Sequence, residues 1–526
     1  MDRALLSALL LVSIALAVEF PGFGWTINPL AQGFYQAGPI KLVRGGGYPI
    51  YLGTYQAVPG NQSGVCVPFW WRDLVGAKQA NDAGINGKGV KVLIIDSGVD
   101  DKVLKQVFGR GVDYHFNAAY QVYKDQCIKN ETIAGIKYCI LEEIPSGWQK
   151  IVYAIPLNQS LDEMGHGTAV AATILSIAPN VTLYSARVAI DMLILDQNNT
   201  LYAKQVLIDS FAVNWALTHA VYGPDLKPGT SDDADIVNMS LGGMFYPSPG
   251  PMESLDIPYE LLIWYLYRVP LQNLSKNVLV VAAAGNDAEN IPAVPAGIDE
   301  ATAVSALEYL NGSWVLAPFT QTGYGIDFAE LGAGMYLPVP KNSIIAQYIN
   351  DSCSNVTGDV KWVRLDGTSF AAPMLSGLAA LWEQASGLKG QELYNLLKSN
   401  AIDLGPTGYD QETGWGMVKA PTGTIVLNNS SSTSSTGIPM IFAPALVALR
   451  KKKKVLAALL LLSASVFALN VTANSVAIAS ALASGVTAYL AYGDLTASVI
   501  SALLGFGIMM SALFLAMLIL KILKKQ

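Results

Sequence analysis

The chain has 526 residues, which is long enough for one large domain with additional segments. Its hydrophobic fraction of 52% is high and its charged fraction of 14% is low for a soluble protein, and the apolar excess lies at the two ends. The formal net charge is −7 and the globular part has no basic stripe, so nothing supports binding to nucleic acid.

The first residues form a short apolar segment. One arginine, Arg3, precedes a run rich in leucine and alanine, and Ala15-Leu16-Ala17 is a cleavage site of the small-x-small type. This pattern predicts a secretory signal peptide over residues 1–17, with an uncleaved N-terminal anchor as the alternative. Residues 18–65 follow as an N-terminal extension rich in Gly, Pro and aromatic side chains.

Two polar residues then stand where regular elements should begin or end. The apolar run Val92–Ile95 predicts a buried parallel strand, and Asp96 closes it before a Ser-Gly turn. Such strand ends are where catalytic groups gather in open α/β sheets. His166 lies between Gly165 and Gly167, ahead of a small-residue helix, and the glycines let other segments approach its ring.

The next segments alternate strand and helix patterns. Residues 181–184 and 236–239 are expected as strands and residues 204–221 as a helix, which indicates a parallel sheet covered by helices. His115 and His219 carry no motif and are interpreted as structural. Asp162 and Glu163 are interpreted as solvated loop charges, although Asp162 has a second interpretation as a residue that shapes the cleft.

Two further motifs complete the core. The run Val278–Ala284 predicts another buried strand, and Asn286 follows it after Gly285. Ser369 stands behind a Gly-Thr turn at the start of a helix that continues to Trp382. Backbone N–H groups at such a helix start attract negative charge, and acyl transfer needs a nucleophile together with donors for an oxyanion.

The composition changes sharply after the core. Residues 428–437 are a Ser/Thr/Asn linker, and residues 438–526 form a hydrophobic region with several predicted membrane-anchoring helices. With the core outside the cell and basic clusters inside, residues 438–449 must cross the bilayer and one later segment, for which 475–492 is the candidate, must not span fully.

Cysteines and asparagines agree with export. The four cysteines, Cys66, Cys127, Cys139 and Cys353, favour disulfides; Cys127 and Cys139 would close a local loop, but three connectivities stay open. No Cys/His cluster has metal-ligand spacing. Asn-x-Ser/Thr triplets are numerous and include Asn61, Asn130, Asn158, Asn180, Asn311 and Asn355. Asn238 heads one such triplet in an expected core strand and should stay unmodified.

The order Asp96, His166, Ser369 is the order of the catalytic residues in subtilisin. With the segments around Asn238, Asn286 and Gly414-Trp415-Gly416, the sequence resembles the subtilisin-like serine proteases, the subtilase family, over roughly residues 66–427. Each residue taken alone also has a purely structural interpretation, as an N-cap serine, a loop histidine or a turn aspartate. The resemblance rests on their combination.

The resemblance implies a fold and a set of roles. The fold is α/β, a subtilisin-like three-layer domain with a mostly parallel sheet between helices, to which the C-terminal apolar runs add transmembrane helices. Ser369 would be the nucleophile, His166 the general base and acid, and Asp96 the residue that orients the ring, while Asn286 and the Ser369 N–H would hold the oxyanion. The cleft walls would be Ser240, Leu241, Gly242, Gly243, Ala282, Ala283, Ala284 and Gly285.

The resemblance also interprets two less regular segments. Residues 18–65 stand where subtilases often carry a propeptide, so a short propeptide and a structural arm are both open. The long interval between Asp96 and His166 makes residues 100–160 an expected surface insertion.

The expected function is a cell-surface serine endopeptidase that cleaves extracellular proteins or peptides with a broad apolar preference. The alternatives are a membrane-tethered processing protease of narrow specificity and a catalytically silent surface scaffold. No cofactor is expected for the chemistry, whereas structural calcium would be in keeping with the family although no ligands can be assigned.

Overall fold

The computed structural model describes residues 68–146, 149–220, 223–225, 227–242, 266–349 and 358–423. The predictions for the signal peptide, the N-terminal extension, the linker and the C-terminal hydrophobic region lie outside these residues, as do those for Gly243, Cys66 and Cys353. Within these ranges no helix combines the length and the apolar character needed to cross a membrane.

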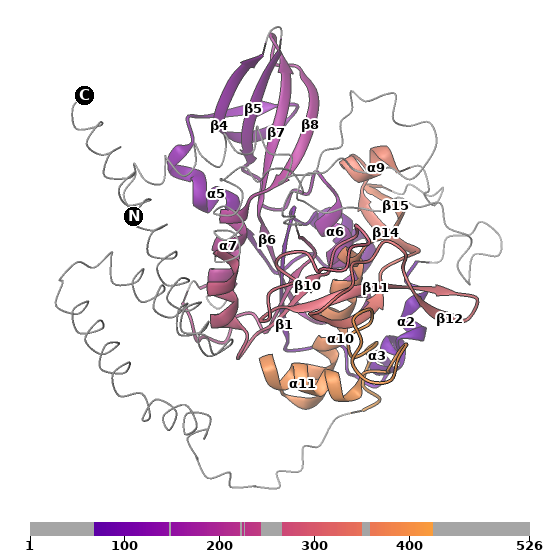
Figure 1. Cartoon of the computed structure of the whole chain (residues 1–526). Helices are drawn as coiled ribbons and strands as arrows, with labels where there is room; N and C mark the ends of the chain where they lie inside the picture. Colours follow the sequence, from indigo (N-terminus) through magenta and orange to yellow (C-terminus); the bar gives the residue numbers. More distant parts are fainter. Residues whose placement is uncertain are drawn as a thin grey trace, which may run out of the picture. The chain divides into compact units, whose positions relative to one another are not determined.

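A mostly parallel sheet lies at the centre (Figure 1). Its strands follow the order β12-β11-β10-β9-β1-β6-β2, with β13 paired to β11. Only the β11–β12 hairpin is antiparallel. The strands are β1 (Lys91–Asp96), β2 (Tyr114–Asn117), β6 (Thr182–Arg187), β9 (Ile236–Met239), β10 (Leu279–Ala283), β11 (Thr302–Leu310), β12 (Ser313–Leu316) and β13 (Ile326–Leu331). The predicted parallel sheet is therefore confirmed.

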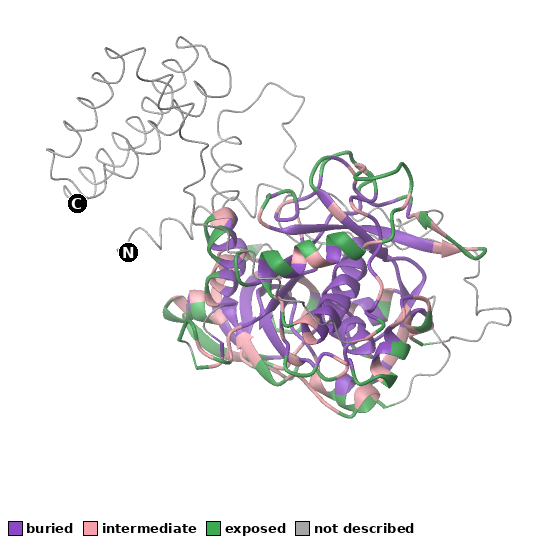
Figure 2. Ribbon diagram, turned by 90° about the horizontal axis from the view of Figure 1, so that it is seen from below, coloured by how far each residue is buried: buried purple, intermediate pink, exposed green. Residues whose placement is uncertain are grey.

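Two helices that carry candidate site residues pack against each other beside this sheet. They are α6 (His166–Ile177) and α10 (Thr368–Ser386), and both are buried over almost their whole length (Figure 2). Helices without a polar face belong to the interior of a protein, in agreement with this position. Further helices include α2 (Trp71–Leu74), α3 (Ala77–Asp82), α4 (Asp101–Phe108), α5 (Ala118–Tyr123), α7 (Ser210–His219), α9 (Ile344–Tyr348) and α11 (Gly390–Asn400).

A second sheet rises from this core (Figure 1). It is fully antiparallel, has the order β3-β4-β5-β7-β8, and encloses a small apolar core of its own that includes Tyr138, Val152 and Leu193. Its strands are β3 (Lys129–Ile133), β4 (Ile136–Ser146), β5 (Gln149–Pro156), β7 (Ala189–Asp196) and β8 (Leu201–Ile208). Two further strands, β14 (Met335–Pro340) and β15 (Val360–Leu365), form a separate hairpin.

The second sheet corrects two predictions. Residues 100–160 are not one insertion, because α4 and β2 belong to the central fold and because the sheet also takes β7 and β8 from beyond His166. The helix expected over residues 204–221 begins only at Ser210, where the Asp209 carboxylate caps it by accepting from the Ala212 N–H at 2.8 Å. The residues before it pair with β7 instead, since an edge of that sheet lies beside them.

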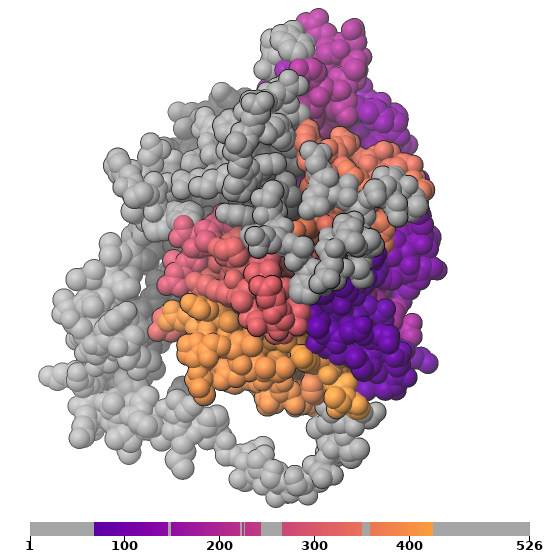
Figure 3. Space-filling model, turned by 90° about the vertical axis from the view of Figure 1, so that its right-hand side faces the viewer, coloured from indigo at the N-terminus to yellow at the C-terminus, as the bar shows by residue number. Residues whose placement is uncertain are grey.

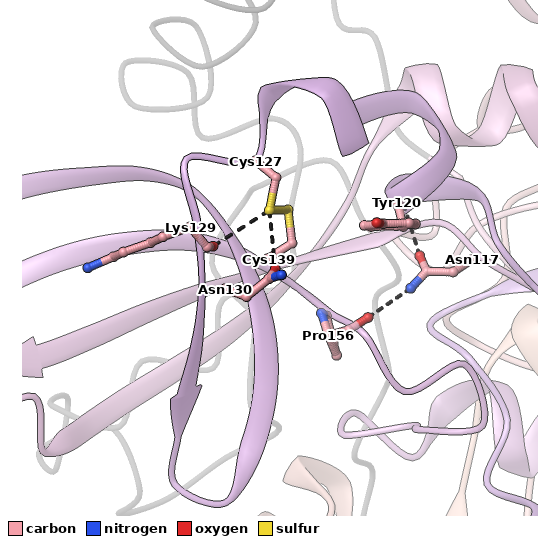
Figure 4. Close-up of a disulfide and its surroundings, with 7 residues drawn as sticks. All are labelled: Asn117, Tyr120, Cys127, Lys129, Asn130, Cys139 and Pro156. Atoms are coloured by element: carbon pink, nitrogen blue, oxygen red, sulfur yellow. Dashed lines mark hydrogen bonds between the residues drawn. A yellow bond between two sulfur atoms is a disulfide. The ribbon is translucent and has the colours of Figure 1, made fainter.

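A disulfide fastens the base of the second sheet (Figure 4). It joins Cys127, just after a short 3₁₀ turn, to Cys139 in β4, with 5.5 Å between the Cα atoms. This is the local pairing among the three connectivities that the sequence allowed. Nearby, the Asn117 amide donates to the Pro156 carbonyl at 2.8 Å and its oxygen accepts from the Tyr120 N–H, so the end of β2 is tied to the end of β5.

The beginning and the end of the described chain meet on one side of the core (Figure 3). The Ala420 N–H donates to the Val75 carbonyl at 2.8 Å, and the Ala420 side chain packs against Gly76. The end of the described chain therefore closes the fold by returning to the first helices.

We expect a pH dependence of stability from Glu383 on α10. Burial, followed by the charge of Asp235, raises the pKa of Glu383 to about 8, although the Lys389 ammonium lies 3.7 Å away and Lys91 also faces it. Glu383 in the folded chain therefore stays protonated up to about pH 8, whereas in the unfolded chain it loses its proton near the ordinary glutamate pKa of 4.5. The corresponding stability is present below pH 4.5 and is lost as the pH rises towards 8. Urea unfolding at pH 5 and pH 9 should show a clearly smaller difference for Glu383→Gln than for the wild type, and equal differences would contradict the assignment.

Candidate active site

Asp96 and His166 meet although 70 residues separate them. Asp96 ends β1 and His166 begins α6, and both side chains are fully buried. The His166 Nδ1 atom lies 2.9 Å and 3.1 Å from the two carboxylate oxygens of Asp96. Because a carboxylate can only accept here, Nδ1 carries the hydrogen and Nε2 is the basic nitrogen of the neutral ring.

The residue after the histidine must be small. A Cβ atom at Gly167 would collide with the Gly98 carbonyl and stand 3.1 Å from the Asp96 Cβ. The Gly167 N–H instead donates to the Ser97 hydroxyl at 3.1 Å. The flanking glycine therefore permits the close approach of the Asp96 turn that the sequence predicts.

Asp162 is buried, and its interpretation as a solvated charge is wrong. It is 1% exposed, and its carboxylate accepts from the Ser97 hydroxyl, the Gly165 N–H, and both the N–H and the hydroxyl of Thr168, at 2.6–2.9 Å. These groups belong to the turn after Asp96 and to the first turn of α6. Asp162 therefore holds together the two segments that present Asp96 and His166. A carboxylate shortly before a helix start is the sequence signal for such a role.

Glu163 is also not solvated, because the second sheet supplies its partners. Its side chain is 8% exposed and receives hydrogen bonds from the Tyr138 hydroxyl, at 3.0 Å, and from the Lys204 ammonium. Both partners lie on strands of the second sheet, so that sheet is connected to the loop before His166. The partners are too distant in sequence for a local pattern to reveal them.

Arg187 connects the same sheet to the Asp96 turn. Its guanidinium is 1% exposed and donates to the Ser97 carbonyl, to the Leu161 carbonyl at 3.2 Å, and to the Asp191 carboxylate at 2.7 Å. Burial raises the pKa of Asp191 to about 6, against the attraction of Arg187. A buried guanidinium thus bridges β7 and the two loops that flank the Asp96–His166 pair.

Ser369 lies in the first turn of α10. It is 3% exposed, and its hydroxyl donates to the Ser240 carbonyl at 3.2 Å. In return the Ser240 hydroxyl donates to the Ser369 carbonyl at 2.7 Å, which fastens the start of α10 to the end of β9. The next side chain, Phe370, places its ring 5.7 Å from the His166 ring, so the start of α10 adjoins the start of α6.

Asn286 is held in a single orientation. It is 1% exposed, and its amide oxygen accepts from the N–H and from the hydroxyl of Thr368, at 2.7 and 2.8 Å. The Thr368 hydroxyl in turn accepts from the Gly285 N–H at 3.0 Å. The amide nitrogen consequently lies on the side of Gly367, 3.3 Å from the position that a Cβ would take there. Sequence reasoning missed Thr368, because nothing local shows that it fixes Asn286.

The expected cleft walls lie around this centre, mostly with buried side chains. Ser240, Leu241 and the alanines from Ala282 to Ala284 are at most 3% exposed. The Ala284 N–H donates to the Val304 carbonyl, and its carbonyl accepts from the Ala293 N–H at 2.7 Å. Gly242 is partly exposed, Gly285 is buried against Gln321, and Gly243 is outside the described residues.

No group of three or more His, Cys, Asp or Glu side chains in the described ranges could hold a metal ion. The expectation of structural calcium, which rests on the family's carbonyl-rich sites, stays a prediction.

Comparison with known protein families and sequences gives matches to one family. The subtilase family profile, peptidase S8, matches residues 87–416. The subtilisin-like protease PopC of Myxococcus xanthus is 27% identical over 354 residues, which cover 66% of this chain and 62% of PopC. Subtilisin BL of Lederbergia lenta is 26% identical over 365 residues, which cover 68% of this chain and 98% of subtilisin BL. A crystal structure of a lanthipeptide protease aligns with a TM-score of 0.44 at 21% identity, covering 68% of this chain and 98% of that one.

The matches leave parts of both sides unaligned. The matched region spans less than two thirds of PopC, whereas it spans nearly all of subtilisin BL. The family profile covers more than half of the present chain and contains Asp96, His166, Asn286 and Ser369. The chain therefore belongs to the subtilase family of serine endopeptidases.

Proposed function

We propose that this chain hydrolyses peptide bonds with Asp96, His166 and Ser369 through an acyl-enzyme intermediate. The observation that carries the proposal is the buried contact of 2.9 Å between His166 Nδ1 and the Asp96 carboxylate, beside the helix start that presents Ser369. A structural histidine would not need a buried carboxylate, whose removal from water is costly.

The proposed reaction begins when the Ser369 hydroxyl attacks the scissile carbonyl carbon. His166 Nε2 takes the hydroxyl proton, and Asp96 stabilises the imidazolium that forms. The Asn286 Nδ2–H and the Ser369 backbone N–H donate to the oxyanion of the tetrahedral intermediate. On collapse the C–N bond breaks and the leaving amine takes the proton from His166. A water molecule then releases the acyl group by the same sequence, which restores the free serine.

A fluorophosphonate probe distinguishes this enzyme from a silent scaffold. We expect the folded full chain to be labelled covalently at Ser369. A chain that has been denatured in acid before the probe is added should not be labelled. The absence of labelling in a folded preparation would favour the scaffold. The site of labelling is read by peptide mass spectrometry, so reaction at another serine would also count against the proposal.

We further propose a broad preference for apolar or aromatic side chains at the cleaved bond. The expected walls consist of small apolar residues, and no acidic cluster suggests recognition of basic side chains. Profiling with a mixture of peptides should give cleavage after many apolar residues. Strict cleavage after paired basic residues would contradict this preference, and cleavage of only a few sequences would favour the narrow-specificity processing protease.

The proposed setting is the cell surface, with residues 438–526 as the membrane anchor. The apolar segments of this region and its basic clusters support an anchor. A chain that ends at Gly437 should be released into the medium as a soluble protein, whereas the full chain should stay with the cells and need detergent. A truncated chain that still sediments with membranes would locate the anchor elsewhere, with residues 1–17 as the first candidate.

We expect the replacement Asn286→Asp to lower kcat by about 10²–10³-fold or more, because it removes an oxyanion donor and adds a negative charge. It keeps an oxygen to accept from Thr368, whereas Asn286→Ala would leave two buried donors without their acceptor at a cost of about 1–3 kcal/mol each. Asp is therefore the sharper variant for a purely catalytic test.

The matched control is Thr368→Ser, which keeps the hydroxyl and should keep most of the activity. Kinetics on a peptide substrate and thermal unfolding would be measured for both variants. A kcat for Asn286→Asp near that of the wild type, in a folded protein, would remove Asn286 from the oxyanion site.

A further inference from the structure

Asparagine has an unusual sequence context in this chain. Of 26 asparagines, 13 are followed two positions later by Ser or Thr with no proline between them. Ser and Thr together make up 59 of 526 residues, so about 3 such triplets are expected by chance. The 13 asparagines are Asn61, Asn130, Asn158, Asn180, Asn198, Asn238, Asn273, Asn311, Asn350, Asn355, Asn428, Asn429 and Asn470.

Two comparisons within the chain show that the excess of Asn-x-Ser/Thr triplets depends on the order of the residues and on the side-chain amide. The reversed triplet, Ser/Thr-x-Asn, occurs 3 times, which is the chance number. The chain also has 26 aspartates, and only 2 of them are followed by Ser or Thr at the same spacing. Asp forms the same side-chain turns as Asn but has no amide nitrogen. A preference for turns therefore does not explain the pattern, whereas chemistry at the amide nitrogen does.

Most of the asparagines of this set that the structure describes lie on the surface. Seven of the 13 lie in described residues, and six of the seven are exposed: Asn130, Asn158, Asn180, Asn198, Asn273 and Asn311. Of the 11 other described asparagines, only six are exposed. The exposed triplets occur on separate elements. Asn198 lies in the β7–β8 turn and Asn311 in the β11–β12 turn, which project from different parts of the described chain (Figure 1).

The amide nitrogens of the six exposed residues are available for reaction. Among the described residues, none of these six nitrogens donates a hydrogen bond, whereas the amides of Asn81 and Asn117 donate to main-chain carbonyls at 3.1 and 2.8 Å. At Asn158 the side-chain oxygen accepts from the N–H and the hydroxyl of Ser160, at 3.2 and 3.3 Å, so the third residue of the triplet already contacts the carboxamide.

Asn238 has the same triplet and the opposite environment. It is fully buried in β9, where its amide donates to the Ser240 hydroxyl at 2.9 Å and its oxygen accepts from Ser376 at 2.9 Å. Its hydroxyl partner is needed inside the core, so this triplet has a structural explanation. It serves as the negative control within the same molecule.

We propose that the exposed Asn-x-Ser/Thr sites carry N-linked oligosaccharides, added during the export that we propose for this chain. The donor is an oligosaccharide linked to a polyprenyl phosphate or pyrophosphate. The asparagine amide nitrogen bonds to the sugar C1, the bond from C1 to the phosphate oxygen breaks, and the amide proton leaves as the lipid phosphate departs. Such glycans are bulky and solubilising, which suits a surface whose chain is otherwise poor in charge.

The test uses the full chain purified from the organism that naturally produces it. After proteolytic digestion, mass spectrometry should find sugar-bearing peptides at most of the six exposed sites and only unmodified peptide at Asn238. Ser313→Ala should remove the glycan from Asn311 and lower the mass of the chain by one glycan, whereas the matched Ser313→Thr should keep it. Both variants should retain the wild-type rate of peptide hydrolysis.

The outcomes separate this proposal from the others. A chain that is found at the cell surface with all six sites unmodified overturns the glycosylation and leaves export standing. A chain that is found unmodified inside the cell overturns both. Labelling of Ser369 by fluorophosphonate is independent of either result, so a failure of the peptidase proposal would be recognised by itself.

Discussion

Replacement of Ser369 by alanine is expected to lower kcat by about 10⁶-fold, the loss known for the serine of subtilisin, because no other group takes over as nucleophile. The residual rate would come from the oxyanion donors and from substrate binding. Stability should change little, since among the described residues the hydroxyl donates one hydrogen bond, of 3.2 Å, which is worth about 1 kcal/mol. Fluorophosphonate labelling should disappear, and peptide hydrolysis should fall to this residual rate.

Ser376→Ala is the matched control on the same helix. Ser376 is fully buried and donates to Asn238 and to the Ala372 carbonyl, at 2.9 and 3.0 Å, so it has a structural role only. We expect its loss to reduce stability while leaving catalysis largely intact. Ser369 would not be the nucleophile if the Ser369→Ala variant hydrolysed peptides at a rate close to that of the wild type. The same would follow if Ser376→Ala abolished labelling in a folded protein.

Replacement of Asp96 by asparagine is expected to lower kcat by about 10⁴-fold. The carboxylate accepts from His166 Nδ1 and also, at 2.6 Å, from the Ser97 N–H. Both contacts end at one carboxylate oxygen, and the other oxygen lies 3.1 Å from Nδ1, so the NH₂ group of an asparagine would come within reach of Nδ1 in either orientation. If the NH₂ group faces Nδ1, the hydrogen moves to Nε2 and the ring can no longer accept the serine proton. The substrate KM should change far less than kcat.

Asp100→Asn controls for the loss of a nearby carboxylate. Asp100 caps α4 by accepting from the N–H groups of Lys102 and Val103, and asparagine caps helices about as well as aspartate does. Full activity is expected for Asp100→Asn, and a proton NMR resonance typical of a hydrogen-bonded Nδ1–H should persist there and vanish in Asp96→Asn. Equal kcat values in the two variants would remove Asp96 from the proposed proton relay.

The sequence was informative where apolar runs end in polar residues. The strands that end at Asp96 and just before Asn286, and the helix that starts at His166, follow from local patterns and are present as expected. The resemblance to the subtilase family gave the expected roles of these residues, but it did not show which contacts hold their side chains in place. The hydrogen bond between Asn286 and Thr368 joins positions 82 residues apart, and no periodicity in either segment predicts it.

Two of the errors share one physical cause, which is a partner far away along the chain. Lys204 and its neighbours are compatible with a helical pattern, and only pairing with β7 decides for a strand. Glu163 belongs by composition to a solvated loop, yet Lys204 and Tyr138 bury it. In both cases the second sheet overrides the local preference, and that sheet forms only when two remote stretches come together.

The second sheet has two origins in the chain, since β3–β5 precede His166 and β7–β8 follow it. It can therefore neither be cut out nor transplanted as a cassette. Removing either stretch would leave β5 or β7 as a bare edge with open main-chain donors and acceptors, which invites aggregation. During synthesis the ribosome must also complete β7 before β5 of the first stretch gains its partner. Any shortened protein engineered from this chain therefore has to trim both stretches together.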